Sequence, residues 1–147
     1  MPFSGGSFAY EVSAPSEIYL DGTLLSASSP GETVRISFTS GNVTAFGANF
    51  FATDDVNAFQ AVSITLTLSD GTSQTFTPTS AADSYRGFVS SGSAFSSIAI
   101  ATSGAQYYTS LDNLTVGAAP VPEPSSLGLL AVGLAGLGGF VARRRAA

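Results

Sequence analysis

The sequence contains no cysteine, histidine, tryptophan or lysine. Without cysteine and histidine there is no disulfide framework, no thiol nucleophile, no imidazole base and no zinc site with nitrogen or sulfur ligands. A Ser-His-Asp triad is excluded for the same reason, and the few acidic residues are scattered along the chain. We therefore predict that the protein is not an enzyme and needs no cofactor, with a structural calcium bound by oxygen ligands as the one open possibility.

Basic residues are also scarce. All five are arginines, and only Arg35 and Arg86 precede residue 120, whereas nine of the ten acidic residues lie in residues 1–119. This part of the chain thus carries a formal charge of −7. A nucleic-acid partner would require the opposite balance of charge, so we expect none.

Sustained helical periodicity is absent from residues 1–119, where apolar and polar residues alternate over short stretches. In Val62–Ser69 and Thr33–Thr39 every second residue is apolar, which is the pattern of a strand with one buried face. Asp21-Gly22 and Asp70-Gly71 stand between such stretches and predict hairpins closed by type I′ turns. Further strands are expected at Phe8–Val12, Glu17–Leu20, Thr23–Ser26, Val43–Phe51, Thr72–Thr77, Tyr85–Ser90, Ile98–Thr102 and Leu111–Gly117.

This succession of short strands and turns predicts an all-β domain over residues 1–119. We expect an antiparallel β-sandwich, with a jelly-roll-like rather than an immunoglobulin-like topology. Met1–Gly6 has neither the basic nor the apolar region of a secretion signal. We therefore expect that Met1 is an internal or misassigned start and that this domain is truncated at its N-terminus.

The chain ends in an uncharged apolar run, Leu127–Ala142, followed by three arginines. As a helix the run is about 24 Å long, slightly short of the roughly 30 Å of a bilayer core. We predict a single C-terminal transmembrane helix whose apolar residues include Leu127, Leu130, Leu134, Leu137 and Phe140. Arg143, Arg144 and Arg145 are expected on the cytoplasmic side, which places residues 1–119 outside the cytoplasm.

A Pro-Glu-Pro signature, Pro122-Glu123-Pro124, follows Val121 directly before the apolar run. The prolines keep this segment extended and leave Glu123 exposed. The order of signature, apolar run and arginines resembles the PEP-CTERM sorting signal of Gram-negative bacterial envelope proteins, here over residues 120–147. The same tail is also labelled an ice-binding protein C-terminal domain, but the chain has no regular Thr-x-Thr ladder to support ice binding.

The PEP-CTERM resemblance implies a route through the envelope. It implies translocation, transient anchoring in the membrane by the C-terminal helix, and cleavage near Pro-Glu-Pro by an exosortase-type enzyme. The product would then be released or attached at the cell surface. The resemblance gives the destination of the protein and leaves its role there open.

Asp112 is the candidate metal ligand. Strand periodicity places it on the same face as Leu114 and Val116, toward the core, where a carboxylate needs hydrogen bonds or a cation. The strand at Tyr85-Arg86-Gly87-Phe88 and the closing Asp112-Asn113-Leu114 resemble jelly-roll domains of PEP-CTERM proteins and carbohydrate-binding modules. In such modules the Asp of the last strand helps to bind a structural calcium, whereas the alternative here is an Asx-type turn.

Aromatic residues supply the candidate carbohydrate site. Tyr107 and Tyr108, together with Tyr85 and Phe88, could stack on sugar rings, although aromatic residues of a sandwich usually belong to its core. Asp54-Asp55 follows the aromatic stretch Phe46–Phe51 and could bind calcium or a sugar hydroxyl, or simply be solvated.

Two functions follow from the sequence. The first is a non-catalytic exported protein with a structural or adhesive role at the cell surface, linked to exopolysaccharide. The alternative is a calcium-dependent carbohydrate-binding module.

Overall fold

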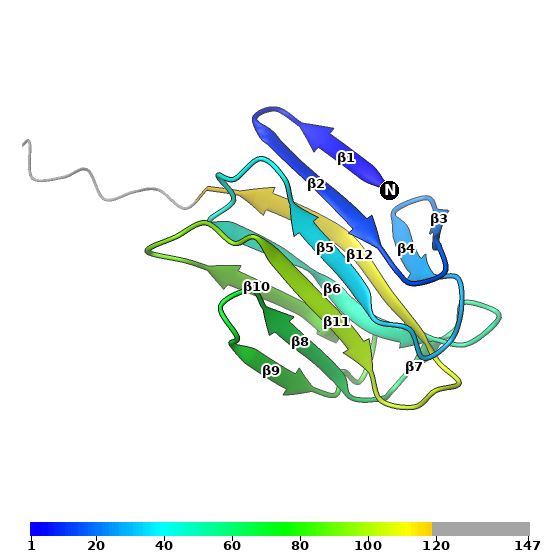
Figure 1. Cartoon of the computed structure of the whole chain (residues 1–147). Coiled ribbons are helices and arrows are strands. Elements are labelled where there is room, and N and C mark those ends of the chain that lie inside the picture. The colour runs from blue at the N-terminus through cyan, green and yellow to red at the C-terminus, as the bar shows by residue number, and fades with distance from the viewer. Residues whose placement is uncertain (119–147) are drawn as a thin grey trace, which may run out of the picture.

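A computed structural model describes residues 1–118 of the chain, and these residues form two antiparallel β-sheets that pack face to face (Figure 1). Sheet A has six strands, in the order β1 (Pro2–Gly5), β2 (Phe8–Ser13), β5 (Val34–Phe38), β11 (Ser97–Thr102), β8 (Ile64–Leu68) and β9 (Ser73–Phe76). Sheet B has the order β10 (Tyr85–Val89), β6 (Ala45–Thr53), β12 (Tyr108–Gly117), β4 (Leu24–Ala27) and β3 (Ile18–Asp21), with β7 (Phe59–Gln60) paired to β6.

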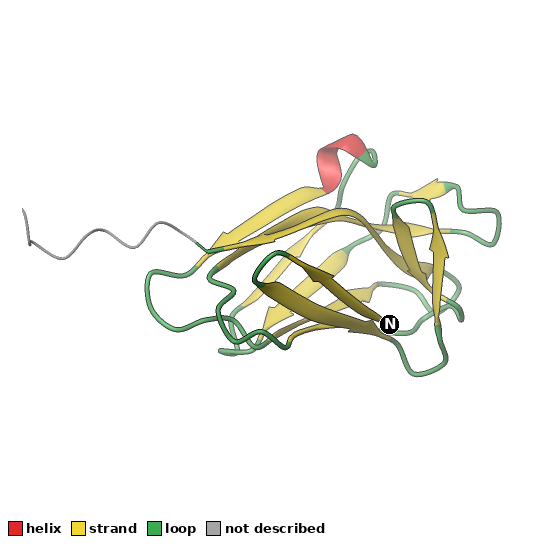
Figure 2. Cartoon of the chain, turned by 90° about the horizontal axis from the view of Figure 1, so that it is seen from above, coloured by secondary structure: helices red, strands yellow, loops and turns green. Residues whose placement is uncertain are grey.

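The two layers are separated by a continuous apolar core. Figure 2 shows both layers and the single short 3₁₀ helix of the described residues, η1 (Ala82–Ser84), at one side. The predicted alternation holds in β8, where Ile64, Leu66 and Leu68 are buried. It holds equally in β5, where Val34, Ile36 and Phe38 are buried. Each such side chain contributes about 1.5–3 kcal/mol when it leaves water, which explains why these stretches fold as strands against the opposite sheet.

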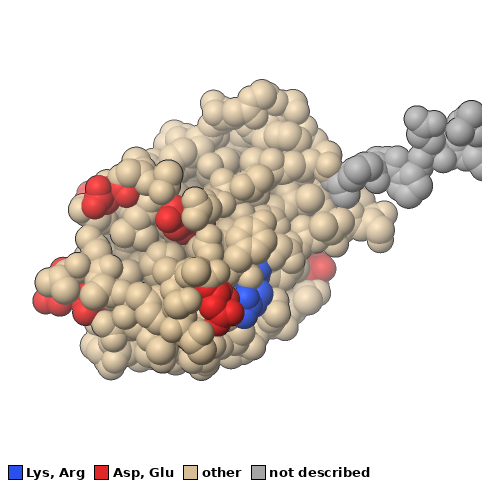
Figure 3. Space-filling view, turned by 180° about the vertical axis from the view of Figure 1, so that it is seen from behind, with Lys and Arg blue, Asp and Glu red and all other residues tan. Residues whose placement is uncertain are grey.

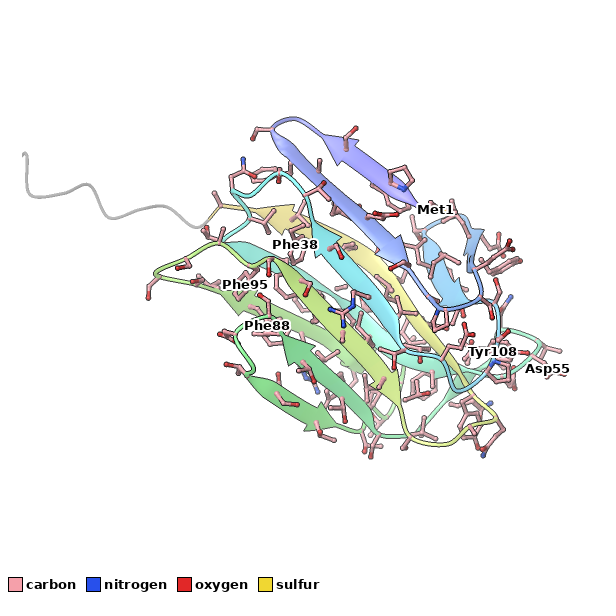
Figure 4. All side chains as sticks on the ribbon, viewed as in Figure 1. Met1, Phe38, Asp55, Phe88, Phe95 and Tyr108 are labelled. Atoms are coloured by element: carbon pink, nitrogen blue, oxygen red, sulfur yellow. The ribbon has the colours of Figure 1, made fainter. Side chains whose placement is uncertain are left out.

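A cluster of phenylalanines closes one end of the core. The ring of Phe46 is only 4% exposed and lies 5.0 Å from the rings of Phe38 and Phe88 and 5.1 Å from that of Phe95. These residues come from both sheets and from the loop before β11, and three of them are labelled in Figure 4. The cluster therefore fixes the distance between the layers at the end where β12 finishes.

The outward face of sheet A carries hydroxyl groups that pair with each other across β8 and β9. Ser63 and Thr77 are 2.8 Å apart, Thr65 and Thr75 2.9 Å, and Thr67 and Ser73 3.4 Å, measured between hydroxyl oxygens. Cross-strand pairs of this kind each stabilise a sheet by a few tenths of a kcal/mol, up to about 1 kcal/mol. The apolar residues of the alternating pattern thus face the core, and the hydroxyl residues form a polar outer surface.

Both predicted hairpins are present, but the turns are not of type I′. A type I′ turn needs positive φ at both central residues, and Asn57 and Asn113 are the only non-glycine residues with positive φ in the described part of the chain. In the β3–β4 hairpin Asp21 pairs with Leu24, so that Gly22, with φ of 60°, is the first central residue. In the β8–β9 hairpin the N–H of Gly71 donates to the carbonyl of Leu68 at 3.0 Å, and Gly71 has φ of 88°.

The all-β antiparallel sandwich predicted from the sequence is confirmed, and every expected strand is found. Strands β1 and β7 were not expected. The jelly-roll-like topology stays a prediction. Within residues 1–118 no helix is long and apolar enough to cross a membrane, and the predicted transmembrane helix with Leu127, Leu130, Leu134, Leu137 and Phe140 lies outside the described residues, as do the Pro-Glu-Pro signature and the three arginines.

Candidate functional site

A hollow of about 330 Å³ lies at one end of sheet B, where β3, β4 and the start of β12 meet the loop after β6. We call it the tyrosine hollow, and it is lined by Tyr19, Ser26, Ala27, Ser28, Asp54, Asp55, Asn57 and Tyr108. Figure 4 shows Tyr108 and Asp55 together at this end of the sandwich. The hollow thus brings together aromatic and polar side chains from four separate segments.

The tyrosines of the hollow come from two strands of the same sheet. Tyr19 on β3 is 46% exposed, and Tyr108 at the start of β12 is half-buried. Tyr107, the other predicted sugar-binding residue, packs instead against the apolar core. The structure therefore separates the predicted pair: Tyr108 lines a surface hollow, whereas Tyr107 is half-buried and packs against the edge of the core.

Asp54 shapes the wall of the hollow. Its Oδ1 accepts the backbone N–H groups of Val56 at 3.1 Å and Ala58 at 2.8 Å, and its Oδ2 accepts the side-chain amide of Gln60 at 2.8 Å. The loop also needs Asn57 in the left-handed region, with φ of 62°. Both carboxylate oxygens of Asp54 therefore hold the loop together through hydrogen bonds, as the side chain does in an Asx turn.

Asp55 behaves differently from its neighbour. Its side chain is exposed, lines the hollow, and makes no hydrogen bond or ion pair with any other residue that the structure describes. The same is true of the side-chain amide of Asn57. These two groups have free hydrogen-bonding capacity at the edge of the hollow.

Beneath the hollow lies a buried chain of hydroxyl groups. Ser110 Oγ is 2.9 Å from Ser26 Oγ and 3.0 Å from Thr53 Oγ1, and the three residues are at most 2% exposed. Because β4, β6 and β12 each contribute one member, the chain ties three neighbouring strands together. It holds the floor of the hollow in place.

Asp112 does not face the core as the period of two predicts. The pairing of β12 with β6 shifts in register between Asp112 and Thr115, which is a β-bulge, and Asn113 within it has φ of 53°. Leu111 is fully buried, so its neighbour Asp112 lies on the opposite face, and the bulge returns Leu114 and Val116 to the core. The period of two was misleading because one extra residue interrupts the strand.

The surroundings of Asp112 consist of backbone and amide groups. The N–H of Asn113 donates to Asp112 Oδ1 at 2.6 Å, and the amide of Asn113 donates to Asn49 Oδ1 at 3.1 Å. Calcium needs six to eight oxygen ligands, and no group of three or more acidic side chains that could hold a metal occurs in the described part of the chain. Calcium at Asp112 stays a prediction, and the local bonds are those of a structured bulge.

The other aromatic candidates lie away from the hollow. Phe88 stacks on Phe46 in the core, with ring centroids 5.0 Å apart. Tyr85 is 51% exposed and lies over Gly47, where its hydroxyl occupies the space that a Cβ atom would need. Tyr85 is thus an exposed tyrosine on the same sheet, with no place in the hollow.

Acidic groups stand at scattered positions over the rear face of the molecule (Figure 3). The N–H and hydroxyl groups of Thr79 donate to Asp83 and hold the pKa of that carboxyl below its usual range. The N–H of Thr72 donates to Asp70 at 2.8 Å and lowers the pKa of that carboxyl in the same way. A lowered pKa in the folded state stabilises the fold above the unfolded pKa, and this contribution is lost as the pH falls through the folded pKa.

Comparisons with known proteins identify the C-terminal region. The family described as PEP-CTERM protein-sorting motif matches residues 120–145. No curated protein and no solved structure matches the chain. The chain therefore carries a PEP-CTERM sorting domain, as predicted, directly after the β-sandwich. This motif indicates a bacterial envelope or exported protein and implies processing by an exosortase-type enzyme.

Proposed function

We propose that the protein is a non-catalytic component of the cell envelope or extracellular matrix, with a structural or adhesive role linked to exopolysaccharide. The observation that carries this proposal is the sorting motif at residues 120–145, which follows an acidic β-sandwich covered with hydroxyl groups. Such a body is rigid and presents a polar surface to a hydrated polymer.

The state of the acidic residues supports a role without catalysis. A glycosidase needs two carboxyl groups on either side of the scissile bond. In the tyrosine hollow Asp54 is engaged by three hydrogen bonds from its own loop, which leaves Asp55 as the one carboxylate with free capacity there. The hollow is thus suited to binding rather than to acid–base chemistry.

The tail supplies the proposed mode of delivery. Residues 127–142 would cross the membrane as a helix, with Arg143, Arg144 and Arg145 at the cytoplasmic surface, until the exosortase-type enzyme cuts near Pro122-Glu123-Pro124. The sandwich would then reach the cell surface or the surrounding matrix. The membrane is a transient partner and the polysaccharide a lasting one.

Fractionation of the native host tests this function. The parent chain is expected in the surface and matrix fractions, bound to polysaccharide and shortened at its C-terminus. A variant with Pro122, Glu123 and Pro124 replaced by alanine is expected to stay uncut in the membrane fraction. Two results contradict the proposal. One is recovery of the uncut parent chain from the cytoplasm, and the other is complete loss of the protein from the polysaccharide when the polysaccharide is washed.

A calcium-dependent carbohydrate-binding module is the second candidate. It is favoured by the position of Tyr108 in a surface hollow beside polar side chains. Binding that requires calcium and fails in Asp112→Asn would select this candidate over a purely structural role. The sorting of the protein is the same in both cases, so the two candidates differ only in binding.

A further inference from the structure

We infer that the tyrosine hollow binds one uncharged sugar residue of a polysaccharide, without a metal ion. This inference rests on the proposed link to exopolysaccharide and gives it a site and a ligand class. It moves the predicted carbohydrate site from Tyr107 and Tyr108 to Tyr108 and Tyr19, which come from different strands.

Tyr19 and Tyr108 supply the apolar part of the site. A pyranose ring presents C–H groups on its face, and an aromatic ring packs against such a face while its hydroxyl group stays in water. Tyr19 is the more accessible of the two, with 46% exposure on the edge strand β3. The hydroxyl groups of both tyrosines are free of bonds to the described residues, so both can also bond the ligand.

Polar groups at the rim match the hydroxyl groups of a sugar. Asp55 and Asn57 offer acceptors and donors without partners in the described residues, and Ser28 adds an exposed hydroxyl group. A hollow of about 330 Å³ lies at the lower end of the range for small-molecule sites. It therefore suits a single sugar unit, with the rest of the polymer outside.

Charge decides which sugars are accepted. Asp54 and Asp55 place two carboxylates at the hollow, and no arginine lines it. An anionic sugar would meet like charges there, which costs affinity and slows association. Asp54 and Asp55 thus select uncharged sugars over uronates and sulfated or phosphorylated sugars.

The rigidity of the hollow supports binding. The buried hydroxyl chain of Ser26, Ser110 and Thr53 fixes the strands beneath it, and the bonds to Asp54 fix the loop at its edge. A preorganised site loses less conformational entropy when it binds. Tyr85 lacks this setting. Thr115 is the one other polar side chain that lines the apolar surface around it, and the hydroxyl group of Thr115 already donates to the carbonyl of Asn113 at 3.4 Å.

Titration calorimetry on the full chain in detergent tests the inference. The probes are short oligosaccharides of glucose, mannose and galactose, compared with oligogalacturonate and measured with and without EDTA. At least one neutral oligosaccharide is expected to bind, more tightly than oligogalacturonate and equally well in EDTA. Tyr19→Ala and Tyr108→Ala are expected to weaken binding about tenfold each, the loss typical of an aromatic contact residue.

Three variants serve as controls. Tyr85→Ala removes a tyrosine of the same sheet whose exposure, 51%, is close to the 46% of Tyr19, and it is expected to leave binding unchanged. Tyr19→Phe keeps the ring but loses the hydroxyl group, and it is expected to weaken binding less than Tyr19→Ala does. Asp55→Asn, in an exposed loop, is expected to raise the affinity for oligogalacturonate relative to the neutral probe, so the charge argument is tested even if Tyr108→Ala fails to fold.

Several results would overturn the inference while leaving the proposed sorting and surface role intact. These are the absence of binding to every neutral probe, an equal loss in Tyr85→Ala, and an unchanged preference in Asp55→Asn. Binding that disappears in EDTA would also overturn it and would favour the calcium-dependent module. Failure of the proposed function would instead be seen in the cell fractions.

Discussion

Replacing Phe46 by alanine probes the contact between the two sheets. The ring is 4% exposed and touches three other phenylalanine rings at centroid distances of 5.0–5.1 Å. Truncation of a buried phenylalanine costs about 3–5 kcal/mol, because apolar contacts are lost and a cavity remains. At about 4 °C per kcal/mol for a domain of this size, the melting temperature falls by about 12–20 °C.

A second variant separates volume from ring geometry. Phe46→Leu keeps most of the apolar volume but loses the aromatic contacts with Phe38, Phe88 and Phe95, so we expect a smaller loss of about 1–2 kcal/mol. Val89→Ala is the control, because Val89 lies on β10 of the same sheet and is 73% exposed. Its expected effect is within about 0.5 kcal/mol.

The assay is urea unfolding of residues 1–118, which contain all the described strands, followed by far-UV circular dichroism and tyrosine fluorescence. The midpoint and slope give the free energy of unfolding for each variant. A cost for Phe46→Ala no larger than that of Val89→Ala would refute the assignment of Phe46 to the centre of the core. A cost for Phe46→Leu no larger than that of Val89→Ala would refute the role of the ring contacts.

Three other expectations concern the hydroxyl chain, the bulge and the acidic turns. Ser110→Ala leaves the buried hydroxyl groups of Ser26 and Thr53 short of a partner and is expected to lower the free energy of unfolding in urea by about 1–3 kcal/mol. An unchanged urea midpoint would contradict the stabilising role of these hydrogen-bonded hydroxyl groups. Asn113→Val forces a β-branched residue into φ of 53° and is expected to cost at least about 1–2 kcal/mol, measured by thermal unfolding against Asn113→Gly as the milder variant. The urea midpoint of the parent is expected to fall as the pH drops below about 4, and to fall less in Asp70→Asn, since the lowered pKa of Asp70 stabilises the fold only while the carboxyl is ionised. An identical pH profile for the two proteins would show that the bond from Thr72 adds nothing.

Local patterns predicted much of the fold. The alternation in Val34–Phe38 and Ile64–Leu68 gave the buried face correctly, because one side of each strand meets the opposite sheet. The Asp-Gly pairs gave the hairpins, although the turn type depends on which residues pair across the strands. Strand β1 was missed because Pro2–Gly5 has no alternating pattern and is held by its pairing with β2.

The candidate site was harder to predict, for two physical reasons. A bulge shifts the period by one residue. Asn113 belongs to a residue type that accepts positive φ, but one asparagine in an alternating stretch does not indicate that the strand gains an extra residue there. The partner of Tyr108 in the hollow, Tyr19, is far away in the sequence and arrives through the order of β12, β4 and β3 in sheet B. The order of strands in a sheet depends on the whole chain. Tyr108 could therefore be predicted as a site residue from the sequence, but its neighbour Tyr19 could not.

The placement of β12 has a mechanical consequence under the proposed anchoring by the tail. The sorting motif begins at residue 120, three residues after β12 ends at Gly117, and β12 pairs with β6 at eight positions and with β4 at Ser110 and Leu111. Drag on the body while the tail is held would pull along the axis of β12. That load would shear the pairs of β12 with β6 together instead of unzipping an edge strand pair by pair, because β12 lies inside sheet B between β6 and β4.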